Sequence, residues 1–136
     1  MKEVLSFFSH DQFAAYVGIE LVDAKPGYAK AKMVIKPHHL NGVGIVHGGA
    51  LFTLADLAFA VAANSHGTIA VAINVNISYL KAAKDGFLIA EAREISRETK
   101  LATHTVEIKN ESGEMVALFQ GLAYGKSTPI SQYSTV

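Results

Sequence analysis

Apolar residues along this chain gather in one long run and alternate with polar residues elsewhere. The run covers residues 50–63, and Asp56 is its only charged residue. It is shorter than the roughly 20 residues that a helix needs to cross a bilayer. We therefore expect a buried core helix that ends near residues 64–67 and needs cover on every side.

The alternating stretches predict β-strands that are buried on one face. The pattern is clearest over residues 28–36 and 69–79, where the odd-numbered residues from Val71 to Tyr79 are expected on one face. Further strands are expected at 19–24, 87–96, 102–110 and 115–124, with a hairpin turn at 111–114. A short helix over His10–Tyr16, with a capping box that starts at Ser9, is expected before them. This order predicts an α+β fold in which an antiparallel sheet curls around the long helix.

Composition narrows the class of protein. A chain of 136 residues, half of them hydrophobic, is expected to form one domain over residues 1–126, with a polar, flexible tail at 127–136. The formal net charge of zero gives no attraction to nucleic acid or to an anionic membrane. The chain has no cysteine, which excludes disulfides and thiolate chemistry and fits a reducing cytosol. Because residues 1–10 have no signal-peptide pattern, we expect a cytoplasmic location.

Asp56 and the glycines before it are the main candidates for chemistry. Burying a lone carboxylate costs several kcal/mol unless it is paired, which favours a functional role over a structural one. Gly48 and Gly49 stand where the helix should begin. They either allow close packing there or bring a backbone N–H toward an oxyanion. An acid or nucleophile together with an oxyanion site indicates acyl transfer.

The spacing of Gly48 and Asp56 predicts a shared site. Eight residues separate them, which is about 12 Å along one helix. They share nearly the same helix face but cannot both touch one reacting carbonyl. If they cooperate, the second must come from another copy of the chain, with the two helices antiparallel about a two-fold axis. This predicts a homodimer with two composite sites.

The loop before the helix holds weaker candidates. Asn41 either orders its own loop or orients a water or a substrate carbonyl. His47 could be a general base or could cap the helix. The spacing of His38, His39 and His47 matches no zinc pattern, so no metal or other cofactor is expected. Residues 42–48 fail as a dinucleotide-binding motif, because His47 stands where the third glycine should be.

A longer pattern runs through these residues. It reads Asn41-Gly42-x-Gly44-x-x-His47-Gly48-Gly49-x-x-Phe52-x-Leu54-Ala55-Asp56-x-Ala58-Phe59-Ala60, then Asn64-Ser65-x-Gly67, and later Asn76-Ile77-Ser78-Tyr79-Leu80-Lys81-x-Ala83. This pattern resembles the phenylacetate-pathway (PaaI-like) branch of the hotdog-fold acyl-CoA thioesterases, in the 4-hydroxybenzoyl-CoA thioesterase superfamily. The likeness extends from about Gly18 to Gly125.

The resemblance implies a five- or six-stranded antiparallel sheet around the helix, and dimers, often paired into tetramers, with active sites shared between subunits. It implies that Asp56 is the general base or the nucleophile and that the Gly48 N–H, supported by Gly49, polarises the thioester oxygen. Asn41 would place water or substrate, and His47 would be a positioning residue. Some relatives carry a serine or threonine where this chain has Ala72; Asn74, Thr68 or a bound water could take its place.

The expected substrate follows from the same resemblance. Phe52 and Phe59 offer an apolar lining for an acyl or aryl group, and Lys81, then Arg93 and Lys100, could bind the phosphates of coenzyme A. We therefore expect hydrolysis of an aryl- or medium-chain acyl-CoA to the free acid and coenzyme A. A dehydratase or hydratase of the same fold and a non-catalytic acyl-CoA-binding module are the alternatives.

Overall fold

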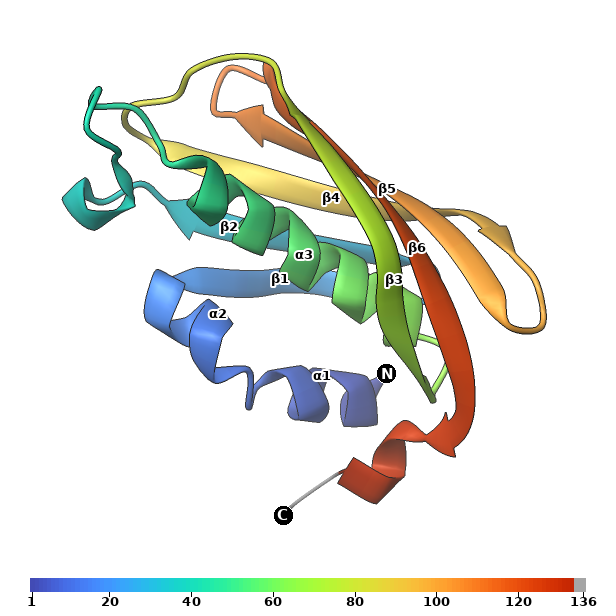
Figure 1. The fold of residues 1–136 in the computed structure, drawn as a ribbon. Helices are drawn as coiled ribbons and strands as arrows, with labels where there is room; N and C mark the ends of the chain where they lie inside the picture. Colours follow the sequence, from blue (N-terminus) through green and yellow to red (C-terminus); the bar gives the residue numbers. More distant parts are fainter. Residues whose placement is uncertain (134–136) are drawn as a thin grey trace.

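The structure is a computed structural model and describes residues 1–133 (Figure 1). Its elements, in chain order, are α1 (Lys2–Phe8), α2 (Gln12–Val17), β1 (Ile19–Lys25), β2 (Tyr28–Val34), the 3-10 helix η1 (Pro37–His39), α3 (Gly48–Asn64), β3 (Thr68–Tyr79), β4 (Phe87–Arg97), β5 (Leu101–Asn110), β6 (Met115–Pro129) and the 3-10 helix η2 (Ile130–Tyr133).

The six strands form one antiparallel sheet in the order β1-β2-β4-β5-β6-β3. The sheet curves around α3, with β3 and β6 crossing beside the helix and α1 and α2 below it (Figure 1). This confirms the predicted α+β fold with a sheet wrapped around a long helix. β1 and β3 are the two edge strands. Within residues 1–133, no helix is long and apolar enough to cross a membrane.

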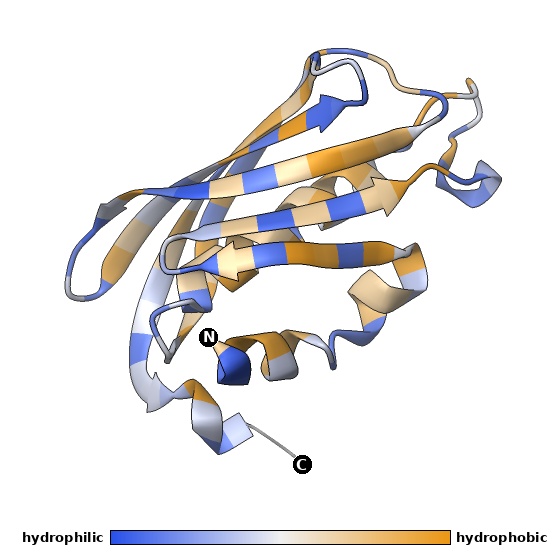
Figure 2. Cartoon of the chain, turned by 180° about the vertical axis from the view of Figure 1, so that it is seen from behind, coloured by the Kyte–Doolittle hydropathy of each residue, from blue (hydrophilic) through white to orange (hydrophobic). Residues whose placement is uncertain are grey.

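Small residues on the inner face of the sheet let α3 approach it closely. Hydrophilic and hydrophobic residues alternate along the strands (Figure 2), and the inward positions of β2 and β4 include four fully buried alanines: Ala29, Ala31, Ala90 and Ala92. Phe59 of α3 lies over Gly121 of β6, where an added Cβ would be 2.7 Å from the ring. Glycine and alanine positions of the sheet therefore make room for the large side chains of α3, such as Phe59.

A β-bulge in β3 breaks the expected alternation. The pairing with β6 shifts between Ala72 and Asn74, which leaves Ile73 as the extra residue. Val71 pairs with Tyr124 on the outer face, whereas Val75 pairs with the buried Gly121 on the inner face. The prediction of one shared face from Val71 to Tyr79 is therefore wrong before the bulge.

The two ends of the described chain pack together, which the sequence did not predict. α1 was not expected, and its Phe7 ring lies 6.1 Å from the ring of Tyr133 in η2. β6 continues to Pro129, and Ile130 is 1% exposed. Residues 127–133 of the expected tail thus form the end of β6 and η2, the flexibility of the tail stays a prediction, and residues 134–136 lie outside the described residues.

The entry into α2 also differs from the prediction. Asp11, not Ser9, is the N-cap, and its Oδ1 accepts a hydrogen bond from the Ala14 N–H at 2.9 Å. The helix ends at Gly18, which has a φ of 91°. The carboxylate of Asp11 thereby lies at the start of α2, which packs against α3.

Candidate active site

Among residues 1–133, one backbone amide in the first turn of α3 has no protein partner. His47 is the N-cap, and its Nδ1 accepts a hydrogen bond from the Gly49 N–H at 2.8 Å. The His47 carbonyl oxygen accepts from the N–H groups of Ala50 and Leu51. In the described part of the chain, the Gly48 N–H donates to no protein atom. Since a helix carries partial positive charge at this end, the free amide favours a carbonyl oxygen or an oxyanion.

Tyr79, at the end of β3, lies directly against Gly48. Its hydroxyl donates a hydrogen bond to the Gly48 carbonyl oxygen at 3.2 Å. A Cβ added at Gly48 would lie 3.1 Å from atoms of the Tyr79 ring, tighter than most real contacts. The glycine therefore allows the ring and the start of the helix to meet.

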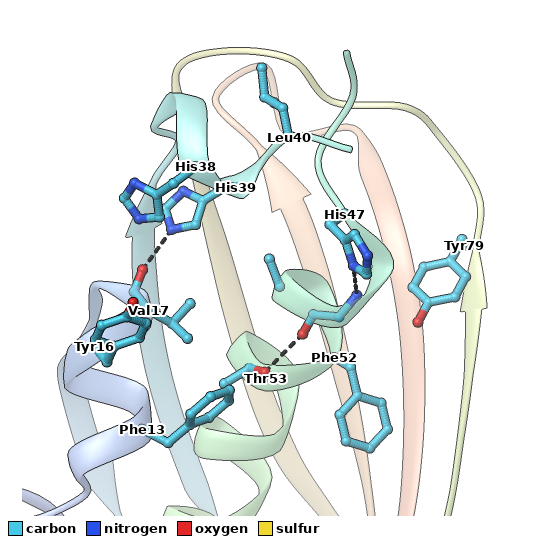
Figure 3. Close-up of a pocket in the computed structure, with 12 residues that line it drawn as sticks. Phe13, Tyr16, Val17, His38, His39, Leu40, His47, Phe52, Thr53 and Tyr79 are labelled. Carbon is cyan, nitrogen blue, oxygen red and sulfur yellow. Dashed lines mark hydrogen bonds between the residues drawn. The ribbon is translucent and has the colours of Figure 1, made fainter. Parts of the chain in front are cut away.

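Two cavities flank this contact. The first, which we call the Phe52 cavity, has a volume of about 610 Å³ and is lined by His47, Gly49, Phe52 and Tyr79 together with residues of α2 and η1 (Figure 3). The second, the Asn41 cavity, has a volume of about 470 Å³. Its lining includes Asn41, Gly48, Leu51, Tyr79 and Lys81. The structure thus brings together Asn41 of the loop and Gly48 at the start of the helix in the lining of one cavity.

Asn41 has the first of its two predicted roles, and its geometry leaves the second open. Its Oδ1 accepts hydrogen bonds from the N–H groups of Val43 at 3.0 Å and Ile45 at 3.3 Å, so the side chain orders its own loop. In residues 1–133 its side-chain nitrogen makes no hydrogen bond to protein. The NH₂ group can therefore still donate to a water or a substrate in the Asn41 cavity.

Asp56 lies two turns further along α3 and is half-buried. Burial raises the pKa of its carboxyl above the ordinary value, and the nearby Asp11 carboxylate adds to the shift. No hydrogen bond from a residue in the range 1–133 compensates the charge. Asp56 is absent from the lining of both the Phe52 and the Asn41 cavities. A single chain therefore does not bring this carboxylate to the Gly48 amide.

The face of α3 that carries Asp56 is the one that its own chain covers least. Gly49, Thr53, Asp56 and Ala60 follow one another at helical spacing, and each keeps part of its surface exposed. The residues on the opposite side of the helix are buried against the sheet. This open stripe leaves room for a second copy of the chain to approach Asp56.

The predicted coenzyme A ligands do not gather at one place. Lys81 lines the Asn41 cavity and makes an exposed ion pair with Glu114 at 3.3 Å. Arg93 lies on the outer face of β4, with its guanidinium 5.3 Å from the centre of the Tyr28 ring. Lys100 is in the turn between β4 and β5, over Tyr124. Only Lys81 therefore lies beside the start of α3.

Other predicted residues lie in the core or on the edge strand. Phe52 lines its cavity, but Phe59 is 2% exposed and packs against Phe119 and the buried His104. The structure therefore places Phe59 in the core, away from the Phe52 cavity. Asn74 is exposed on β3, immediately after the bulge.

His39, in η1, has structural partners for both nitrogens of its ring. His39 is 3% exposed; its Nδ1 accepts a hydrogen bond from the Lys36 N–H, and its Nε2 bonds the Val17 carbonyl oxygen at 2.6 Å. Both ring nitrogens are therefore occupied and connect η1 to α2. Among residues 1–133 no cluster of His, Asp or Glu side chains is placed to hold a metal ion.

Three aromatic residues at the cavities were missed by the sequence analysis. Tyr79 was placed on one face of a strand and in the family-like pattern but given no role, and Phe13 and Tyr16 were placed only in a short helix. In the structure Phe13 and Tyr16 line the Phe52 cavity and are 63% and 85% exposed (Figure 3). Their spacing of three residues, which places both on one face of α2, was the available signal.

A family model decides the class of the protein. The model of the thioesterase superfamily matches residues 43–117, which include the end of the loop after Asn41, the start of α3, Asp56 and Tyr79. This chain belongs to the thioesterase superfamily.

Individual proteins resemble the chain over most of its length. A provisionally named esterase of Archaeoglobus fulgidus is 45% identical over 118 residues, which are 86% of this chain and 77% of that protein. The acyl-coenzyme A thioesterase PaaI of Escherichia coli is 33% identical over 120 residues, 88% of this chain and 86% of PaaI. The structure of PaaI, from the phenylacetic acid degradation operon, has a TM-score of 0.90 and covers 94% of both chains at 32% identity.

A third relative was solved with a ligand. It is a hypothetical thioesterase from Streptococcus pneumoniae, with coenzyme A. That structure is 26% identical to this chain, has a TM-score of 0.83 and covers 90% of this chain and 96% of its own. The hotdog fold expected from the sequence is thus shared with thioesterases.

Proposed function

We propose that this protein hydrolyses acyl-CoA thioesters to a carboxylic acid and coenzyme A. The observation that carries the proposal is the free Gly48 N–H at the start of α3, between two cavities. A thioester carbonyl is an activated electrophile, and one well-placed N–H stabilises the oxyanion that forms on it. The names of the PaaI relative and of the relative solved with coenzyme A support this substrate class.

Water is the second reactant. The thioester oxygen accepts a hydrogen bond from the Gly48 N–H, supported by Gly49 and His47, while Asn41 orients the water or the carbonyl. As a general base, Asp56 takes a proton from the water while the water oxygen bonds to the carbonyl carbon. The tetrahedral intermediate then loses the thiolate, which takes up the proton as coenzyme A.

Asp56 could instead attack the carbonyl carbon itself. That route gives a mixed anhydride, which water then cleaves. The two routes differ in where the solvent oxygen first appears. In a single turnover in ¹⁸O-water, label in the Asp56 carboxyl group identifies the nucleophilic route with water attacking the aspartyl carbon of the anhydride, whereas the general-base route labels only the released acid.

The proposed site is shared between two copies of the chain. Gly48 and Asp56 lie in one continuous helix, about 12 Å apart along its axis, and the stripe that carries Asp56 is open. β3 is an edge strand whose Ile73 is 55% exposed, and an unpaired edge is a natural place for a second strand. We expect a homodimer in which Asp56 of one copy faces Gly48 of the other; pairing of dimers into a tetramer stays a prediction.

The cavities support an assignment of the two parts of the substrate. The larger Phe52 cavity, rich in aromatic residues, suits an aryl- or medium-chain acyl group. The Asn41 cavity, with Lys81 at its side, suits the coenzyme A arm. Roles for Phe59, Asn74, Arg93 and Lys100 in binding stay predictions, as does a cytoplasmic location.

A panel of acyl-CoA substrates tests the proposal. Thiol release from aryl- and medium-chain acyl-CoA, lost in Asp56→Ala with the oligomer intact, is the expected result. Double-bond hydration without thiol release would favour the dehydratase alternative. Binding of acyl-CoA by a folded protein without any turnover would favour the binding module.

A further inference from the structure

Tyr79 makes two separate contacts with Gly48. Its hydroxyl donates to the Gly48 carbonyl oxygen, and its ring lies 3.1 Å from the position of a Gly48 Cβ. The carbonyl belongs to the peptide that follows Gly48, and the free N–H belongs to the peptide that precedes it. Holding the Cα and the following peptide therefore restricts the directions in which the free N–H can point to those reached by rotation about the N–Cα bond.

Tyr79 is also common to the two cavities. Gly48 and Leu51 line only the Asn41 cavity, whereas Gly49 and Phe52 line only the Phe52 cavity, and Tyr79 lines both. Its ring and the first turn of α3 thus form the wall between the two spaces. Although 54% of its surface is exposed, the side chain is tied to the helix by its hydroxyl.

From these contacts we infer that Tyr79 is a positioning and specificity residue for thioester hydrolysis. It aims the Gly48 amide and divides the acyl space from the space for the coenzyme A arm. The inference rests on the proposed function. A thioester whose oxygen lies at Gly48 has its acyl group on one side of the Tyr79 ring and its sulfur on the other.

The two contacts predict different effects of two substitutions. Tyr79→Phe removes the hydroxyl and keeps the ring, so kcat should fall by about 3- to 10-fold, the effect of one net hydrogen bond. KM and the order of preference among acyl groups should stay unchanged. Tyr79→Ala removes the wall, so the ratio of kcat/KM for dodecanoyl-CoA to that for hexanoyl-CoA should rise by about tenfold or more.

Tyr133 provides a matched control. It is also 54% exposed, but its ring packs on Phe7 at the far end of the chain. Tyr133→Phe and Tyr133→Ala should keep the kinetic constants and the acyl preference of the wild type. Circular dichroism and gel filtration check that each variant is folded, and Tyr79→Leu replaces Tyr79→Ala in the same comparison if the latter fails to fold.

The outcomes separate this inference from the proposed function. A wild-type protein that releases no thiol from any acyl-CoA overturns the proposed function and the inference with it. An active wild type whose Tyr79→Phe variant keeps full kcat overturns the positioning role. An active Tyr79→Ala or Tyr79→Leu variant with an unchanged acyl preference overturns the dividing role.

Discussion

Gly48→Pro removes the proposed oxyanion donor with little other change. The Gly48 N–H has no protein partner in the described chain, so proline at this first helical position breaks no hydrogen bond. His47 has a φ of −61° and a ψ of 137°, the extended conformation that a residue before proline prefers. We therefore expect the helix to form as in the wild type.

The expected size of the effect follows from the chemistry of the donor. Loss of one oxyanion hydrogen bond costs about 3 to 4 kcal/mol of transition-state stabilisation, a fall in kcat of about 10²- to 10³-fold. The new Cβ adds crowding, because it lies 3.1 Å from the Tyr79 ring. Gly48→Ala brings the same Cβ and keeps the N–H, so it measures the crowding alone.

The assay compares kcat for acyl-CoA hydrolysis in the two variants, by thiol release. Thermal unfolding and gel filtration establish that both are folded and have the wild-type oligomeric state. Because its Cβ crowds Tyr79, Gly48→Ala should lose no more than the about 3- to 10-fold in kcat expected for loss of the Tyr79 hydrogen bond, whereas Gly48→Pro should lose almost all activity. Equal kcat values in two folded variants would refute the role of the amide.

Three further predictions concern Asp56, a buried histidine and the core. Asp56→Asn should lower kcat by about 10²-fold or more. Because the base must be ionised, wild-type kcat/KM should rise with pH through a pKa above the ordinary Asp value. A rise of kcat/KM centred at that ordinary pKa would contradict this. Burial lowers the pKa of His104, whose ring nitrogens make no hydrogen bond to residues 1–133. The stability linked to its neutral form is therefore present above about pH 6.5 and is lost as pH falls. His104→Leu should flatten urea midpoints between pH 5 and 8, and an unchanged slope would exclude His104 as the cause. Gly121→Ala should lower stability by about 1–3 kcal/mol because its Cβ meets Phe59 at 2.7 Å, whereas Gly125→Ala, with a nearest atom at 3.7 Å, should not lower Tm.

Much of the fold was predictable because its signals are local. The apolar run predicts α3, and alternation predicts β2, since each pattern depends only on neighbouring positions. The bulge at Ile73 was not predictable, because it depends on how β3 pairs with β6, about fifty residues further along the chain. α1 and η2 were missed for a similar reason: both are short, and each is stabilised by contact with the other end of the chain.

The candidate site shows the same limit. Asn41 and Gly48 are close in sequence, so their meeting at one cavity could be predicted from the loop alone. Arg93 and Lys100 were grouped with Lys81 by charge, but the sheet order places them on another face and at another end. Phe59 reads like Phe52 in an apolar helix, and only the position of the sheet separates a core residue from a cavity residue.

The central claim is that one copy supplies Asp56 and another supplies the Gly48 amide. Co-expression of Gly48→Pro and Asp56→Ala chains, each inactive alone, tests it most directly through the thiol-release activity of the mixed oligomer. Random pairing gives heterodimers with one intact composite site, so we predict recovery of about a quarter of wild-type activity. Mixed dimers, verified by mass spectrometry, that stay as inactive as either parent would contradict the shared site.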